Sequence, residues 1–226
     1  GLTTSVASDF LSVLGPVEIG EDRFTPQNIA DALENAVQFT FANRGVTHDR
    51  RKDIIQEIVN VMRERFAALT LAEWSKIFTS VAVRLSDKHL MFFSPNPEVE
   101  RLFVRQGWGG RVAENFDGDS LMVVDANLAA LKTDPAVHRT ISYALNRDGD
   151  DLVATVTVVY DHTQPFGPKI TRYRTFTRVY VPEGSELLSI EGSLEDDALN
   201  NPTLTPDEPV IGTELGKTVF GAFISV

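Results

Sequence analysis

Three consecutive cations, Arg50, Arg51 and Lys52, follow Asp49 where a helix is expected to begin. The first amide groups of a helix are free to bind an anion, and guanidinium groups bind phosphate through paired hydrogen bonds. Cations are otherwise unfavourable at this end of the helix dipole. The segment therefore predicts a phosphate or pyrophosphate site. The structural alternative is a solvated helix start capped by Asp49.

A second group of cations occupies alternate positions of an expected strand, with aromatic residues between them. The row contains Arg172, Arg174, Phe176, Arg178 and Tyr180. Side chains two residues apart share one face of a strand, so the row can bind an anionic glycan or a partner surface. The alternative is pairing of these arginines with carboxylates on neighbouring strands.

Trp108 is a further candidate for binding a glycan or a partner, because it lies between Gly107 and the pair Gly109 and Gly110. An exposed indole ring in such a segment can stack on a sugar. The alternative is that the ring fills the seam between two subdomains.

A polar cluster follows the expected strand Leu121–Asp125. It contains Asp125, Asn127, Lys132 and Asp134. A lysine among carboxylates is suited to acid–base chemistry. The alternative is a turn network that satisfies buried backbone groups.

Several kinds of site have no signature in this sequence. There is no cysteine, and the four histidines lack the spacing of zinc ligands. Nucleophile-elbow and phosphate-loop motifs are also missing. We therefore expect no metal site and no cofactor, and the catalytic residues of any reaction stay unassigned.

The net charge of −11 is uneven: residues 1–92 carry −2 and residues 93–226 carry −9. An acidic surface repels phosphate backbones, so the composition argues against binding to nucleic acid or to anionic membranes. Uncharged apolar runs are far shorter than the roughly 20 residues that span a bilayer. Membrane attachment would thus require an anchor that is missing from this sequence.

Helical periodicity dominates the first part of the chain. Helices are expected after Thr25-Pro26 and from about Thr47. Thr70 and Glu73 form a capping box. It opens a third helix with an apolar side that we expect to be buried, made of Trp74, Ile77, Phe78, Val81 and Leu85.

Strand alternation dominates after a junction at 93–110, which contains a short helix, Pro97–Arg105. The strands are expected at Leu121–Asp125, Arg139–Leu145, Leu152–Tyr160, Tyr173–Val181 and Thr218–Val226. Tyr173–Val181 is expected to pair with Leu152–Tyr160. The sequence therefore predicts an α+β protein, with an α-rich subdomain over 1–92 and an antiparallel sheet or sandwich over 111–226.

The strand Thr218–Val226 is apolar on both faces and is suited to the centre of a sheet. We expect its hairpin partner to lie beyond Val226. On this hypothesis the β subdomain is truncated at its C-terminus. The strand would then lie at an open sheet edge or pair with a strand from another chain.

Seven segments, in collinear order, resemble domain-of-unknown-function family 4012. They are Phe10–Val17, Phe24–Asn28, Arg51-Lys52, Gln106–Gly110, Val124–Asn127 followed by Lys132–Asp134, Arg178–Pro182 and Glu214–Phe220. The resemblance covers nearly the whole chain. It implies a membrane-anchored protein outside the cytoplasmic membrane of a bacterium or archaeon, continuing beyond both ends of this sequence. The family has no agreed activity that could be carried over.

Residues 10–68 resemble, more distantly, the C-terminal half of the LytR–CpsA–Psr cell-wall transferases. These enzymes transfer glycopolymers from a lipid pyrophosphate. The match departs from the family pattern, because Arg50 and Arg51 are adjacent and Lys52 replaces a glutamine. The family's catalytic aspartate would lie before Gly1. The leading hypothesis is therefore a non-enzymatic extracytoplasmic envelope module with a binding or structural role, whose partner would be an envelope polymer or another protein chain. The alternative is the incomplete half of a glycopolymer transferase.

Overall fold

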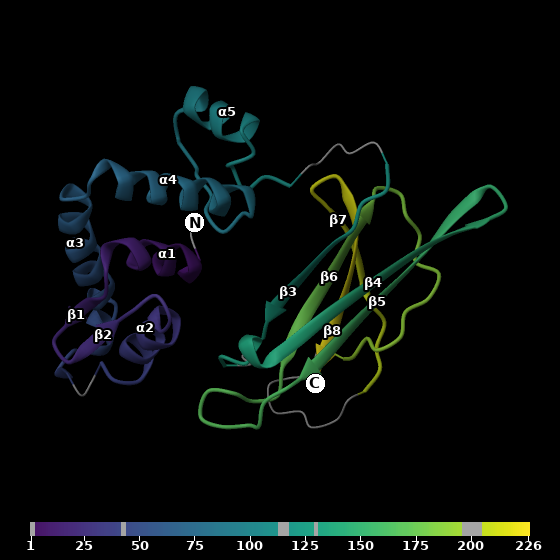
Figure 1. Ribbon diagram of the computed structural model, residues 1–226. Helices are drawn as coiled ribbons and strands as arrows, with labels where there is room; N and C mark the ends of the chain where they lie inside the picture. Colours follow the sequence, from purple (N-terminus) through teal and green to yellow (C-terminus); the bar gives the residue numbers. More distant parts are fainter. Residues whose placement is uncertain (1–2, 42–43, 113–117, 129–130, 196–204) are drawn as a thin grey trace. The chain divides into compact units, whose positions relative to one another are not determined.

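The computed structural model describes residues 3–41, 44–112, 118–128, 131–195 and 205–226. The chain forms two compact units, Gly1–Arg111 and Val112–Val226 (Figure 1). The first unit is helical and the second consists of antiparallel sheets. The predicted α+β class, with a helical half followed by a β half, is confirmed. The expected junction helix lies in the first unit.

The N-terminal unit contains a small hairpin among its helices. The helices are α1 (Thr4–Leu14), α2 (Ile29–Gln38), the short 3₁₀ helix η2 (His48–Arg50), α3 (Asp53–Ala67), α4 (Leu71–Ser86) and α5 (Pro97–Arg105). The hairpin pairs β1 (Val17–Ile19) with β2 (Asp22–Phe24). Among the described residues, no helix is both long and apolar enough to cross a membrane.

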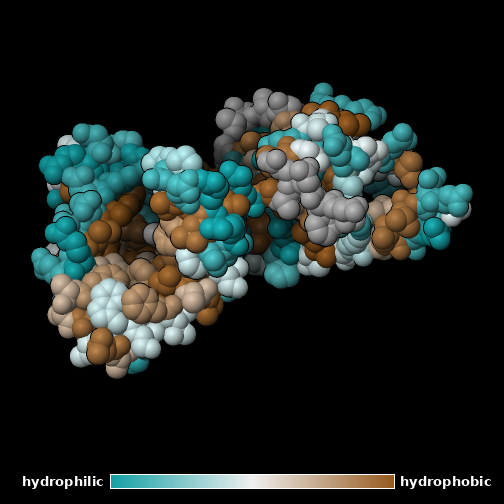
Figure 2. Space-filling view, turned by 90° about the horizontal axis from the view of Figure 1, so that it is seen from above, coloured by the Kyte–Doolittle hydropathy of each residue, from teal (hydrophilic) through white to brown (hydrophobic). Residues whose placement is uncertain are grey.

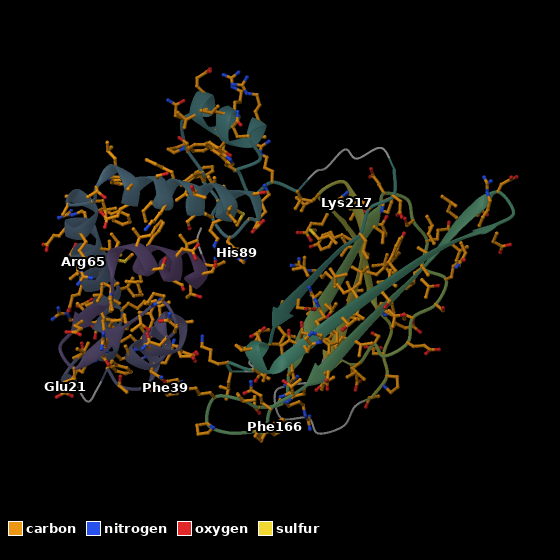
Figure 3. All side chains as sticks on the ribbon, viewed as in Figure 1. Glu21, Phe39, Arg65, His89, Phe166 and Lys217 are labelled. Atoms are coloured by element: carbon orange, nitrogen blue, oxygen red, sulfur yellow. The ribbon has the colours of Figure 1, made fainter. Side chains whose placement is uncertain are left out.

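Arg65 joins α3 to the end of α1. Its Nη1 donates to the carbonyl oxygens of Leu14, Gly15 and Pro16 at 3.1, 3.1 and 2.7 Å (Figure 3). The last carbonyl groups of a helix have no partner within the helix, and the guanidinium of Arg65 supplies one here. Beside it the buried core includes Leu11, Val17, Phe24, Ile54 and Ile58.

The helix starts follow the sequence signals with two shifts. The helix expected from about Thr47 begins, as α3, only at Asp53, after the 3₁₀ helix η2. The capping box of Thr70 and Glu73 is present in both directions. α2 begins at Ile29 rather than after Thr25, because Thr25 and Asn28 form a turn by exchanging hydrogen bonds between backbone and side chain. Helix α2 thus starts one turn later than the sequence signal.

The prediction that Phe78 is buried is wrong, since its side chain is 64% exposed. Its ring stacks on Trp74 with a centroid distance of 5.4 Å, and Trp74 stacks on Phe66. Leu71 is also exposed, and the N-terminal unit shows hydrophobic side chains at its surface (Figure 2). The apolar stripe of α4 is wider than the surface that α1 can cover.

The C-terminal unit contains a four-stranded antiparallel sheet in the order β3-β6-β8-β7. The strands are β3 (Met122–Asn127), β6 (Arg174–Pro182), β7 (Val210–Glu214) and β8 (Lys217–Ser225). A separate hairpin pairs β4 (Val137–Asp148) with β5 (Asp151–His162), and the short helix η3 (Asp134–Ala136) leads into it. Tyr173–Val181 was expected to pair with β5. It instead pairs, as β6, with β3 and β8.

The prediction that Thr218–Val226 is an open sheet edge is wrong. β8 pairs with β6 on one side and with β7 on the other. The hairpin partner precedes the strand in the chain. A two-residue turn at Leu215 and Gly216, both with positive φ (55° and 63°), joins β7 to β8, as type I′ turns do. β8 therefore has the central position that its apolar faces favour.

Candidate functional site

A pocket of about 400 Å³ opens between the base of the β4–β5 hairpin and the four-stranded sheet. All its lining residues belong to the C-terminal unit: Val123, Val124, Asp125, Asp134, Val137, Arg139, Tyr160 and Tyr173. The pocket thus combines carboxylates, a guanidinium group and two phenol rings. Pockets with a few converging polar groups are the usual binding sites of small ligands.

Asp125 is the polar centre of this pocket. Its Oδ1 accepts hydrogen bonds from the hydroxyls of Tyr160 at 2.6 Å and Thr177 at 2.8 Å. Its Oδ2 accepts a charge-assisted hydrogen bond from Arg139. Asp125 and Thr177 belong to the sheet and Arg139 and Tyr160 to the hairpin, so this one carboxylate holds the hairpin on the sheet.

Asp134 forms the second polar group at the pocket. It accepts a hydrogen bond from Asn127 Nδ2 at 2.6 Å, and its Oδ1 lies 3.5 Å from the hydroxyl of Tyr173. The rings of Tyr160 and Tyr173 lie 6.0 Å apart between centroids. Asp134 itself is exposed, so a ligand in the pocket can reach it.

The phenol groups are held in their protonated form. Burial, together with the hydrogen bond to Asp125, raises the pKa of Tyr160. Burial and the charges of Asp125 and Asp134 raise the pKa of Tyr173. The hydroxyls are therefore hydrogen-bond donors near neutral pH.

All four tyrosines should titrate late when the protein is folded. The hydrogen bond to Asp119 raises the pKa of Tyr143 to about 12, and burial with a hydrogen bond to Glu214 raises that of Tyr180. A tyrosine in an unfolded chain titrates at pH about 10. We expect the phenolate absorbance of the folded protein to rise only above that pH. A tyrosine titrating at its ordinary pKa in the folded state would contradict the described hydrogen bonds.

The free energy of unfolding should also change as the tyrosine hydroxyls lose their protons. Because the folded pKa values are raised, the tyrosines stabilise the fold fully below pH about 10, and this contribution is lost as pH rises through the folded values. We expect the free energy of unfolding, measured by denaturant titration, to fall from that pH upwards. The Tyr160→Phe variant should show a shallower fall.

The predicted polar cluster is brought together in part. Asp125 and Asp134 both line the pocket, and Asn127 binds Asp134. Lys132 is exposed, and its backbone N–H donates to the carbonyl oxygen of Lys169. The cluster thus contributes carboxylates to the pocket, and Lys132 is not among the lining residues.

The basic row lies partly on β6. Arg174, Phe176, Arg178 and Tyr180 alternate on this strand, whereas Arg172 precedes it. Arg178 and the Tyr180 hydroxyl both bind Glu214 Oε2, at 3.2 and 2.8 Å. The guanidinium of Arg178 also lies over the Tyr180 ring. Here the arginine pairs with a carboxylate of a strand in the same sheet.

The three cations before α3 are placed less favourably for binding an anion than the sequence predicts. Arg50 pairs with Asp53 at 2.8 Å, and Arg51 donates to the carbonyl oxygen of His48 at 3.0 Å. Lys52 is exposed and precedes the first residue of α3, Asp53. The first turn therefore carries a carboxylate of its own, and this arrangement does not favour phosphate.

Trp108 is partly buried within the N-terminal unit. Its ring packs against the cluster of Val6, Leu85 and Leu90, and its backbone N–H donates to Phe103 O at 2.8 Å. The indole thus fills a small satellite core.

Sequence reasoning missed Arg139, Tyr160 and Tyr173 as site residues. A signal was available for the first two, since both belong to expected strands, and these strands pair so that Arg139 and Tyr160 are cross-strand partners. Their meeting with Asp125 depends on how the hairpin lies over β3, which local patterns do not show. Among the described residues, no three histidine, aspartate or glutamate side chains gather as a metal site would require.

Comparison with family models, with curated proteins and with solved structures finds no match for this chain.

Proposed function

We propose that the chain is a non-catalytic binding module of the cell envelope and that the pocket at Asp125 takes a hydroxyl-rich ligand, such as a segment of a neutral glycan. The observation that supports this is the lining itself, in which acceptors and donors surround two tyrosine rings. Sugar hydroxyls pair with carboxylates and guanidinium groups, and the apolar face of a sugar ring packs on phenol rings.

Charge favours a neutral ligand over an anionic one. The pocket holds two carboxylates, Asp125 and Asp134, against one guanidinium, Arg139. Residues 93–226 carry a net charge of −9. A phosphate-rich polymer would meet repulsion here, whereas uncharged hydroxyl groups would not.

A location outside the cytoplasmic membrane belongs to the same proposal. Its support is the collinear resemblance of seven segments to a family of anchored extracytoplasmic proteins. A polymer-binding module is consistent with that location, because envelope polymers are the hydroxyl-rich ligands present there. The transferase alternative receives no such support from the start of α3, where Arg50 pairs with Asp53.

The experiment is a binding titration with neutral oligosaccharides of cell-wall and capsule type, followed by NMR or calorimetry. We expect Asp134→Ala to weaken binding at least tenfold, because its exposed carboxylate borders the pocket. Asp161→Ala is the matched control, since Asp161 is an exposed residue of β5 that does not line the pocket. Equal binding by both variants, or no binding of any neutral glycan, would refute the proposal.

A further inference from the structure

The β4–β5 hairpin is the least supported element of the C-terminal unit. Its strands are 12 residues long, and its tip extends beyond the four-stranded sheet (Figure 1). Among the described residues, the side-chain hydrogen bonds from the hairpin to the rest of the unit come from Arg139, Tyr143, Tyr160 and His162, towards its base and middle. A two-stranded hairpin alone is marginally stable in water. Pairing with a further strand would therefore stabilise the distal half.

The middle of β4, before the charged residues Arg147 and Asp148, also lacks the features that protect a sheet edge. Residues 140–146 of β4 contain no charged residue and no proline, although charge and proline are the usual protection. Leu145 and Leu152 are 44% and 65% exposed. Among the described residues, β4 pairs with β5 and with no other strand.

The hairpin turn determines which backbone groups of β4 are free. Asp148 and Asp151 close a two-residue turn, so they form a hydrogen-bonded pair. Hydrogen-bonded and non-hydrogen-bonded pairs alternate along an antiparallel ladder. The N–H and C=O groups of Ile141, Tyr143, Leu145 and Arg147 therefore point away from β5, towards an open edge.

We propose that this edge pairs with β4 of a second copy of the chain, antiparallel, about a twofold axis at Ala144. Tyr143 then lies opposite Leu145 of the other copy, and Ile141 opposite Arg147. Each pair is repeated by the symmetry. No like charges meet in this register, and the smallest side chain of the segment lies where the two backbones approach most closely.

Neighbouring registers are less favourable. An axis at Tyr143 would place Arg139 opposite Arg147 of the other copy, and like charges in that position are destabilising. An axis at Ser142 would extend the paired segment to Val137 and Arg139, where the hairpin meets the sheet. The charge pattern and the free distal edge together favour pairing over Ile141–Arg147.

The chain has no cysteine, so a single introduced cysteine gives an unambiguous test. Across a twofold axis at Ala144, two Ala144→Cys side chains lie within reach of a disulfide. Two Ser142→Cys side chains would lie about 13 Å apart, at ~3.3 Å per residue. We expect oxidised Ala144→Cys to form a covalent dimer and the Ser142→Cys control, on the same strand and face, to stay monomeric.

A second readout uses no cross-link. Sedimentation equilibrium of the unmodified chain should show a concentration-dependent dimer. Ala144→Lys should raise its dissociation constant at least tenfold by placing two ammonium groups at the axis. Thr155→Lys is the control, because Thr155 pairs with Ala144 within the hairpin but lies on β5. A chain that stays monomeric at several hundred micromolar, a dimer indifferent to Ala144→Lys, or a Ser142→Cys cross-link would each overturn the proposal.

Discussion

Replacing Asp125 by alanine is expected to lower the free energy of unfolding by about 3 kcal/mol. The substitution leaves the Tyr160 and Thr177 hydroxyls and the Arg139 guanidinium without their common acceptor. The side chain of Asp125 is 15% exposed and that of Arg139 34% exposed. The expected cost is therefore at the low end of that for a buried pair. Denaturant unfolding of the purified variant measures it.

Asp161→Ala is the matched control, since Asp161 is an exposed carboxylate of β5. Its substitution should change stability by less than about 0.5 kcal/mol. Hydrogen exchange adds a local readout: in Asp125→Ala the amides of β4 and β5 should exchange faster, while those between β6 and β8 keep their protection. Equal stability of the two variants would show that Asp125 does not hold the hairpin on the sheet.

Replacing Gly221 by alanine is expected to cost about 2–3 kcal/mol through overpacking. Gly221 lies in β8 opposite Arg178 of β6, and the Phe176 ring covers it. A Cβ at this position would meet the ring, with Cε1 at 3.0 Å. That ring also packs on Phe223 at 4.7 Å between centroids, so it has little room to move.

At Gly212 of β7, by contrast, we expect that substitution by alanine causes no loss of stability. A Cβ there meets nothing within 4 Å, so Gly212→Ala should leave stability unchanged or raise it by up to about 1 kcal/mol. A double-mutant cycle of Gly221→Ala with Phe176→Leu isolates the contact. The pair should cost less than the sum of the single substitutions, because the smaller side chain removes the clash. Additive costs would show that the ring does not limit this position.

Local sequence patterns were sufficient to predict those helices and strands whose signals come from residues a few positions apart. The reciprocal hydrogen bonds of Thr70 and Glu73 begin α4, and Asn96 with Pro97 begins α5. The alternation of Leu152–Tyr160 gave β5, although the strand extends further in both directions. These helices and strands could be predicted because each signal depends only on residues that are near in the sequence.

Strand order could not be predicted in the same way. β7 has only five residues, all of them exposed, so it lacks the alternation that marks a strand. Because the sequence does not reveal β7, it offers β8 no partner on its second side and predicts an open edge. In the structure β8 pairs with both β6 and β7. The meeting of Asp125 with Tyr160 likewise joins residues 35 positions apart, which needs the packing of a hairpin on a sheet.

The central position of β8 has a consequence for synthesis on the ribosome. Proteins emerge from the N-terminus, and β8 follows all the other strands of its sheet in the chain. Until residues 217–225 emerge, β6 can pair only with β3, and β7 has no neighbour at all. Nascent chains arrested before residue 217 should therefore expose the unpaired edge of β6 to proteases and chaperones. Arrest after residue 225 has emerged should restore protection to the whole sheet in a single step.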